Sequence, residues 1–356
     1  MAGVFRNRSN REPGEPQGAA AKTHPSPNVA RASPAPIEVY AEALGLDANI
    51  VTARARSLDP EERVIAEAIL THFQANRPGP ASFPSIALQV LDLVRDPEVN
   101  VGELARLVGL DAALSAAMLV LANSPVFRGV SSIRTVRDAV SRLGMQEVAR
   151  LAAAISTRSL YQGGIRAEFE LFGPIWNQLY YHAVTVARAA SELAQVRRLA
   201  IPEEVFVAGM LHDVGKSIAL RSLAALVLSK KIIDGEAEST QRVLHRVHVE
   251  VGGDVHREWR LPDHLVRVAL LHHDASVPPG PENAEVHLVR LVSALNLLRF
   301  AGMQVHAEAF SEVVQSAGAL GLSPERVQAL QASLVETEQW VQMLFGDELG
   351  GPAAAH

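Results

Sequence analysis

The sequence predicts an all-α protein built from two packed helical subdomains. Through most of the chain, apolar residues recur every three or four positions, which is the spacing of an amphipathic helix. Proline, glycine and aspartate interrupt this spacing at short intervals, as expected where helices are joined by turns. No segment shows a sustained two-residue alternation rich in β-branched side chains, so we expect no sheet.

The first part of the chain lacks helical spacing. Residues 1–36 are rich in Pro, Arg, Ala, Ser and Asn, and they carry too few aliphatic side chains to offset the entropy lost on ordering. We expect a disordered tail there, followed by an N-terminal helical extension over residues 37–77. Within this extension, the stretch LDPEERVIAEAILTHFQ predicts a helix with Asp59 as its cap and Pro60 in its first turn.

The first subdomain is expected over residues 78–162. Breaks at Pro84, DPEVN and GLD divide its first part into three helices, and SSIRTVRDAVSRLGMQEVARLAAAISTRSLY predicts two more, divided at Gly144. Ser132 and Thr135 are both candidate N-caps for the first of this pair.

The second subdomain is expected over residues 165–303. After a break in QGGIRAEFELFG, a long helix is predicted through IWNQLYYHAVTVARAASELAQ, and shorter helices follow. The stretch SPERVQALQASLVETEQWVQMLF predicts a terminal amphipathic helix in a C-terminal helical segment over residues 304–347.

Composition excludes several classes of function. The 356 residues include no cysteine, which rules out disulfides, thiolate zinc sites and cysteine nucleophiles, so any metal must be held by histidine and carboxylate. A net charge of −6 gives no global basic face and disfavours nucleic acid as a partner, although QVRRLAIP is locally basic. Without a long apolar run or an apolar region after the N-terminal charges, we expect no membrane contact and a cytoplasmic location.

Several ionisable residues of the second subdomain stand in apolar surroundings. Burying one such group without a partner costs a few kcal/mol, so we expect these side chains to meet one another or a cation. Imidazole and carboxylate suit manganese, ferrous iron or zinc better than magnesium. The candidate metal ligands are His182 in an apolar helix, the adjacent pair His212 and Asp213, His248 before a Val-Gly-Gly break, and His272 and His273 at the end of an apolar run.

The stretch AGMLHDVGKSIAL adds two expectations for this site. Gly215 would let the backbone turn sharply after the His212–Asp213 pair, and Lys216 would then face the same opening, where it could bind a phosphate oxygen.

Ordinary structural roles remain open for the same residues. His182 would then be a packed core residue or a surface residue, Asp213 a helix cap, and Lys216 a charge at a helix C-terminus that complements the dipole. Four other histidines are expected at solvated helix positions, namely His245, His256, His264 and His287.

Residues 78 to about 303 resemble the HDOD domain of bacterial signalling proteins. The resemblance rests on a proline near the start, DP before the second helix, D-x-x-L opening the third, LANS closing it, and then I-x-T-V-x-x-A-V-x-x-LG. It implies an HDOD domain whose second subdomain is HD-like, similar to the HD phosphohydrolases and to the HD-GYP phosphodiesterases of cyclic di-GMP. Most members of the HDOD family are regarded as regulatory or scaffold modules.

The resemblance also assigns roles to residues of this sequence. His182 matches the first HD ligand, His212 and Asp213 match the HD pair, and Lys216 matches the phosphate-facing lysine. The additional histidines of HD-GYP proteins are matched by His248, His272 and His273.

Two parts of the enzyme pattern are missing. The late aspartate of HD enzymes is replaced by Ser293 or Ala294, with Asn296 as the nearest polar substitute, and no Gly-Tyr-Pro follows. We therefore expect a non-catalytic signal-transduction module that acts through contacts with signalling proteins. Whether this module retains a bound metal is left open. Self-association is also left open. The alternative is a metal-dependent phosphohydrolase or cyclic di-GMP phosphodiesterase, in which Asp213 and Lys216 would be catalytic.

Overall fold

The computed structural model divides the chain into two units, residues 1–33 and 34–356. The first unit and the predicted tail lie outside the described residues, so the tail stays a prediction. The structure describes residues 37–46, 58–78, 83–84, 86–96, 98–127, 129, 131–232, 237–300 and 307–349.

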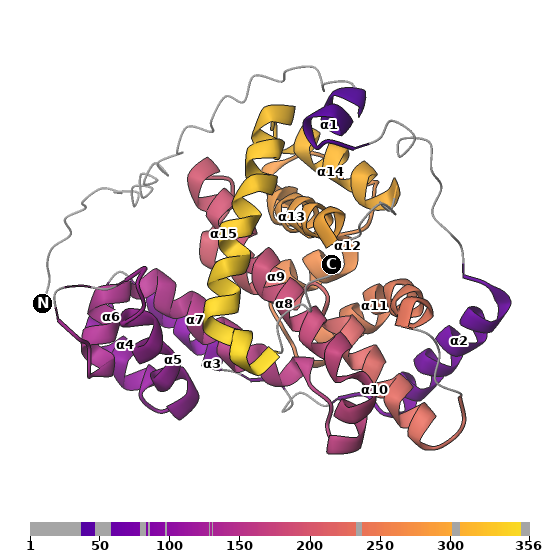
Figure 1. Ribbon diagram of the computed structural model, residues 1–356, viewed down its shortest axis with the longest axis horizontal. Helices are drawn as coiled ribbons and strands as arrows, with labels where there is room; N and C mark the ends of the chain where they lie inside the picture. Colours follow the sequence, from indigo (N-terminus) through magenta and orange to yellow (C-terminus); the bar gives the residue numbers. More distant parts are fainter. Residues whose placement is uncertain are drawn as a thin grey trace, which may run out of the picture. The chain divides into compact units, whose positions relative to one another are not determined.

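Within these ranges the chain forms helices and no strand, which confirms the predicted all-α class (Figure 1). The helices are α1 (Ile37–Ala43), α2 (Pro60–Ala75), α3 (Ile86–Arg95), α4 (Val101–Val108), α5 (Ala112–Ala122), α6 (Val136–Leu143), α7 (Met145–Thr157), α8 (Arg166–Arg197), α9 (Pro202–Leu211), α10 (Val214–Leu228), α11 (Ala237–Glu258), α12 (Asp263–Leu271), α13 (Ala284–Phe300), α14 (Ala307–Ala319) and α15 (Pro324–Leu349), with short 3-10 turns η3 (Arg158–Tyr161) and η4 (Pro281–Asn283).

Helix α2 begins as its sequence predicts and packs on α10 and α11. The Asp59 side chain accepts a hydrogen bond from the backbone N–H of Glu62, and the Glu62 carboxylate accepts one from the N–H of Asp59, which completes a capping box. Buried Glu62 also accepts hydrogen bonds from Arg242 and Ser239 of α11. These bonds attach α2 to the second helical group.

Helices α3 to α7 pack on one another as the first group. Thr135 caps α6 by accepting from the N–H of Asp138, which selects it over Ser132. Gly144, with φ of 81°, separates α6 from α7 as expected. The asparagine of LANS, Asn123, bonds both the N–H and the carbonyl of Ile133 and so fixes the loop that leads to α6.

Helices α8 to α13 form the second group. Helix α8 begins at Arg166, nine residues before the predicted start, and therefore contains Pro174. Proline removes one helical hydrogen bond. Burial of Phe172, Ile175 and Trp176 on both sides of the proline offsets that loss.

Two glycines let helices of this group approach closely. A Cβ on Gly209 of α9 would lie 2.5 Å from the Cα of Ala187 on α8, and a Cβ on Gly215 of α10 would overlap the carbonyl oxygen of His248 on α11. The expected sharp turn at Gly215 and the expected break after His248 were therefore wrong. Helix α11 runs unbroken through its Gly-Gly pair because these residues receive the backbone of α10.

The C-terminal helices cover the second group. Helix α14 packs on α13, and α15 packs on α8 and α1. Arg188 of α8 stacks 4.0 Å from the ring centre of Trp340, and Tyr181 donates to the backbone carbonyl of Glu338 on α15. Among the described helices, none combines the length and the apolar character that crossing a bilayer requires.

Candidate metal centre

The six predicted ligands come together in the second helical group. The two closest sets share one carboxylate, and within each set the ligand atoms lie within 4.8 Å of one another. Five helices supply them: His182 from α8, His212 from the C-terminal cap of α9, Asp213 from the N-cap position of α10, His248 from α11, and His272 and His273 from the residues that follow α12.

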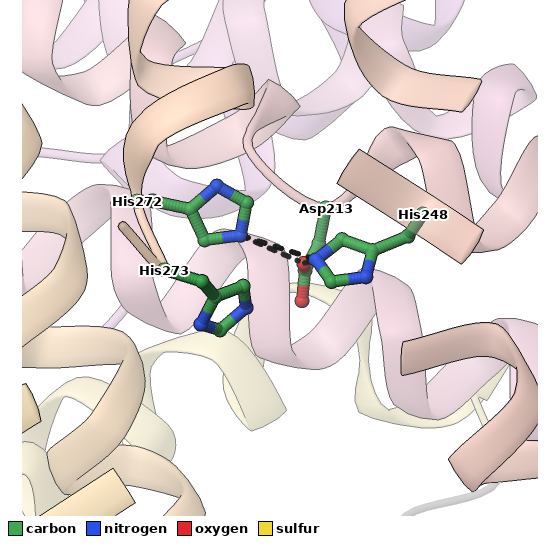
Figure 2. A group of neighbouring side chains, drawn as sticks. All are labelled: Asp213, His248, His272 and His273. Carbon is green, nitrogen blue, oxygen red and sulfur yellow. Dashed lines mark hydrogen bonds and ion pairs between the residues drawn. The ribbon is translucent and has the colours of Figure 1, made fainter. Parts of the chain in front are cut away.

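One set surrounds the Oδ1 atom of Asp213, and we call it the Oδ1 side. It contains His248, His272 and His273. The Nε2 atoms of His248 and His272 lie 3.3 and 3.5 Å from Oδ1, and they are 3.2 Å from each other. Figure 2 shows these two rings directed at the carboxylate from different helices, with His273 beside them.

The hydrogen bonds of these two rings fix where their lone pairs point. Nδ1 of His248 donates to the carbonyl of His245 at 2.6 Å, and Nδ1 of His272 donates to the carbonyl of Val268 at 3.0 Å. Burial keeps both rings neutral, because it lowers the pKa of His272 to about 4 and the pKa of His248 well below its usual range. With the proton on Nδ1, each Nε2 carries a lone pair. Two lone pairs and a carboxylate oxygen therefore face one another without a proton between them.

A divalent cation would resolve this arrangement. Neighbouring ligands of an ion with bonds of roughly 2.0–2.2 Å lie about 3.0–3.4 Å apart, which is close to the spacing of the three facing atoms. Three buried atoms of the cluster also lack hydrogen-bond partners among the described residues: Oδ1 of Asp213, Nε2 of His212 and Nε2 of His273. The residues present thus fit a metal held by imidazole and carboxylate.

Glu312 of α14 supports the Oδ1 side from behind. Its Oε1 accepts a hydrogen bond from Nδ1 of His273 at 2.6 Å, which leaves Nε2 of that ring free of hydrogen. A carboxylate behind a histidine commonly orients metal ligands in this way. Burial raises the pKa of Glu312 to about 7. The sequence analysis did not identify Glu312, which lies 39 residues from His273.

The other set surrounds Oδ2 of Asp213, and we call it the Oδ2 side. Nε2 of His212 and Nε2 of His182 lie 3.4 and 3.6 Å from Oδ2. The ammonium group of Lys216 is nearer, at 2.6 Å from the same oxygen. This side therefore contains an ammonium group of the chain itself.

Helix α13 completes the Oδ2 side with neutral groups. Nδ1 of His182 donates to Oδ1 of Asn296 at 2.7 Å, and the hydroxyl of Ser293 donates to Nε2 of His182 at 3.1 Å. Of the three residues that the sequence offers in place of the late aspartate, Ser293 thus faces the cluster, and Asn296 lies behind the ring.

The electrostatics favour an ionised aspartate among neutral histidines. Burial opposes the charge of Asp213, but Lys216 and His212 outweigh burial and hold the pKa of the carboxyl well below its usual range. Burial also lowers the pKa of His182 and His212 to about 4. At neutral pH the imidazoles are therefore ready to bind a cation.

The structure also tests the ordinary structural roles expected for Asp213 and for the four other histidines. Asp213 occupies the N-cap position of α10, but its carboxylate caps no backbone N–H. His245 is exposed as expected, and His264 is half-buried. The expectation of solvated positions was wrong for His256 and His287, which are buried because α11 and α13 are covered by other helices on several sides.

A second group of side chains that could hold a metal lies apart from the Asp213 cluster. Glu204, His264 and Glu285 come from the first turns of α9, α12 and α13, and they line a cavity of about 350 Å³. Nδ1 of His264 lies 3.0 Å from Oε2 of Glu285. These side chains are half-buried and do not belong to the centre around Asp213.

Known proteins match this chain over most of its described helices. Among solved structures, an HDOD domain protein with unknown function from Geobacter sulfurreducens is 26% identical, with a TM-score of 0.57 over 80% of this chain and 99% of that one. A candidate metal-dependent phosphohydrolase from Shewanella amazonensis SB2B is 18% identical, with a TM-score of 0.53 over 77% of this chain and all of that one, and this likeness shows the fold alone.

A sequence relative is an uncharacterized protein of Treponema pallidum (strain Nichols), 23% identical over 225 residues. The match covers 61% of this chain and 42% of that protein, so this chain spans less than half of the relative's length. The HDOD domain model itself matches residues 81–275, more than half of the chain and all but one helix of both helical groups. This chain belongs to the HDOD domain family.

Proposed function

We propose that the protein is a non-catalytic regulatory module of signal transduction that holds a divalent metal ion at the Asp213 cluster and acts through contacts with signalling proteins. Iron, manganese and zinc are the ions that its histidine and carboxylate donors suit. We expect the module to work in the cytoplasm.

The metal part of the proposal depends on one observation. Nε2 of His248, Nε2 of His272 and Oδ1 of Asp213 are all hydrogen-bond acceptors, yet they lie 3.2–3.5 Å apart in a buried place. Without a cation, this contact is repulsive and leaves acceptors desolvated, which costs free energy. Three helices, α10, α11 and α12, bring these atoms together, so a bound cation is the economical reason for the contact.

The non-catalytic part depends on the Oδ2 side. A divalent ion would supply Lewis-acid chemistry to a phosphoryl group, and hydrolases of this kind commonly use paired ions. Here the Ser293 hydroxyl and the Asn296 amide hold His182, and neither group brings negative charge. A neutral oxygen binds a divalent cation more weakly than a carboxylate does, so we expect the cluster to lack the full enzyme centre.

Exposed apolar side chains support the contacts with signalling proteins. Leu110, Val120 and Val126, at the two ends of α5, are among the most exposed large apolar residues, and α5 itself carries no charged residue. Exposed apolar side chains at these positions are available for contact with a partner protein. Sedimentation velocity of the wild type and of Val120→Asp would show whether a second copy is the partner.

The test combines metal analysis with an activity assay. Protein purified without chelator or histidine tag is expected to contain iron, manganese or zinc. It is expected to hydrolyse neither cyclic di-GMP nor nucleotides when manganese, iron or magnesium is supplied. Asp213→Ala should remove the metal. A metal-free wild type that also fails to take up added ions would contradict the metal site.

The second candidate is a metal-dependent phosphohydrolase or cyclic di-GMP phosphodiesterase. It is favoured by the convergence of all six ligand-type residues with Lys216, which would face the phosphate. Turnover above a metal-only blank that Asp213→Ala abolishes would establish this candidate and refute the non-catalytic role.

A further inference from the structure

The two sides of Asp213 differ in their supply of protons, and this difference sets how many ions the centre can take. On the Oδ1 side, each of the three rings donates its Nδ1 proton away from the centre, to a carbonyl or to Glu312. Within the described residues, no donor is directed at the three Nε2 atoms or at Oδ1. A divalent cation would satisfy all the acceptors of this side at once.

The Oδ2 side has donors of its own for Oδ2 of Asp213 and for Nε2 of His182, whereas Nε2 of His212 has no hydrogen-bond partner among the described residues. The Lys216 ammonium lies 2.6 Å from Oδ2, and the Ser293 hydroxyl lies 3.1 Å from Nε2 of His182. The Lys216 side chain is 12% exposed, so its charge is largely shielded from water and acts directly on the carboxylate. Lys216 also follows Asp213 by one helical turn, which holds the two groups together.

The charges of the cluster point the same way. The Asp213 carboxylate and the Lys216 ammonium lie 2.6 Å apart and offset each other's charge on the Oδ2 side. One divalent ion on the Oδ1 side adds two positive charges. A second ion would add two more beside the Lys216 ammonium, with no further carboxylate on that side among the described residues.

We propose that the Lys216 ammonium is a built-in cation on the Oδ2 side, so that the centre binds one divalent ion per chain, on the Oδ1 side. This inference depends on the metal binding proposed above. It assigns Lys216 to balancing charge on Asp213 in place of a second ion, in contrast to the phosphate-facing role that the resemblance implies.

The experiment counts manganese ions by titration and elemental analysis, with electron paramagnetic resonance to detect coupling between neighbouring ions. All variants carry His264→Ala, which removes the separate group with Glu204 and Glu285 from the count. This background protein is expected to bind one uncoupled ion per chain. Lys216→Arg keeps the positive charge and should also bind one ion.

The decisive variant removes the cation and supplies a carboxylate at the position that faces His182. Lys216→Met with Ser293→Asp is expected to bind two ions, with a signal of coupled manganese. Lys216→Met with Asn296→Asp is the matched control, because it adds the same charge behind the ring at Nδ1, and it should bind one ion.

Each result separates the two proposals. Two coupled ions with Lys216 intact would overturn the role of Lys216 and leave metal binding standing. A folded Lys216→Met, Ser293→Asp protein that still binds one ion would also overturn that role. No bound ion in the background protein would overturn both proposals.

Discussion

A single added methyl group at Gly215 tests how the helices assemble the centre. A Cβ there would overlap the carbonyl oxygen of His248 and lie 2.7 Å from the backbone nitrogen of Gly252, whereas real Cβ atoms essentially never come within 3.0 Å of other atoms. Both contacts are backbone atoms of a regular helix, so no side chain can rotate away. In Gly215→Ala, α10 and α11 must therefore separate by about 1 Å, a strain of the overpacking kind.

The expected cost follows from this separation. Overpacking of a dense core costs about 1–3 kcal/mol, and contact with backbone places Gly215→Ala at the upper end. The same movement carries His248 away from Asp213, where Nε2 now lies 3.3 Å from Oδ1. Metal sites tolerate displacements of only about 0.5 Å, so we expect metal affinity to fall by roughly tenfold or more.

The assay compares denaturant unfolding of the apo protein with metal titration of the holo protein. Gly318→Ala is the matched control, because Gly318 is an exposed residue of α14 and a Cβ there would meet nothing within 4 Å. It is expected to stabilise the protein by up to about 1 kcal/mol through helix propensity. A Gly215→Ala protein with unchanged stability and unchanged metal affinity would refute the close approach of α10 and α11 as the basis of the centre.

Three further predictions concern the surroundings of the centre and the packing of α2. Glu312→Gln replaces the carboxyl group behind His273 with a neutral amide and is expected to weaken metal binding by roughly 10-fold to 100-fold in a chelator competition assay. Burial lowers the pKa of His212 from 6.5 to about 4, so between these values the unfolded chain binds more protons than the folded one. The free energy of unfolding of the apo protein should therefore fall as pH is lowered from about 6.5 to about 4, as measured by urea unfolding at several pH values. A value that stays level would contradict the neutral buried ring. Glu62→Ala breaks a buried ion pair and should destabilise the protein by about 3 kcal/mol, whereas Glu61→Ala, at an exposed position, should change unfolding by less than about 0.5 kcal/mol.

The cluster could be predicted from the sequence because burying a histidine or aspartate without a partner is costly. A histidine among apolar residues needs a partner wherever the helices lie, and the resemblance to HD proteins named the same residues. The helix starts at Asp59 and Thr135 could be predicted for a similar reason, because an N-cap depends only on neighbouring residues in the chain. Properties set by local chemistry could thus be predicted.

Properties set by a partner helix could not. A Gly-Gly pair is compatible with a helix break and with a site of close packing, and only the position of α10 decides between them at Gly252. The burial of His256 and His287 has the same origin. A polar residue on a helix is solvated only if one face of the helix meets water, and α13 contacts α8, α9, α12, α14 and α15.

The support of the centre extends beyond the part of the chain that the family model matches. Glu312 on α14 holds His273, and Glu338 on α15 accepts hydrogen bonds from Asn296 and Arg299 at 3.4 and 3.1 Å. Asn296 in turn holds His182. Residues 81–275 thus supply every candidate ligand. The groups that orient His182 and His273 come from α13 to α15. Because these outer groups orient His182 and His273, substitutions in α13 to α15 would change the affinity of the proposed metal site without a change in any ligand.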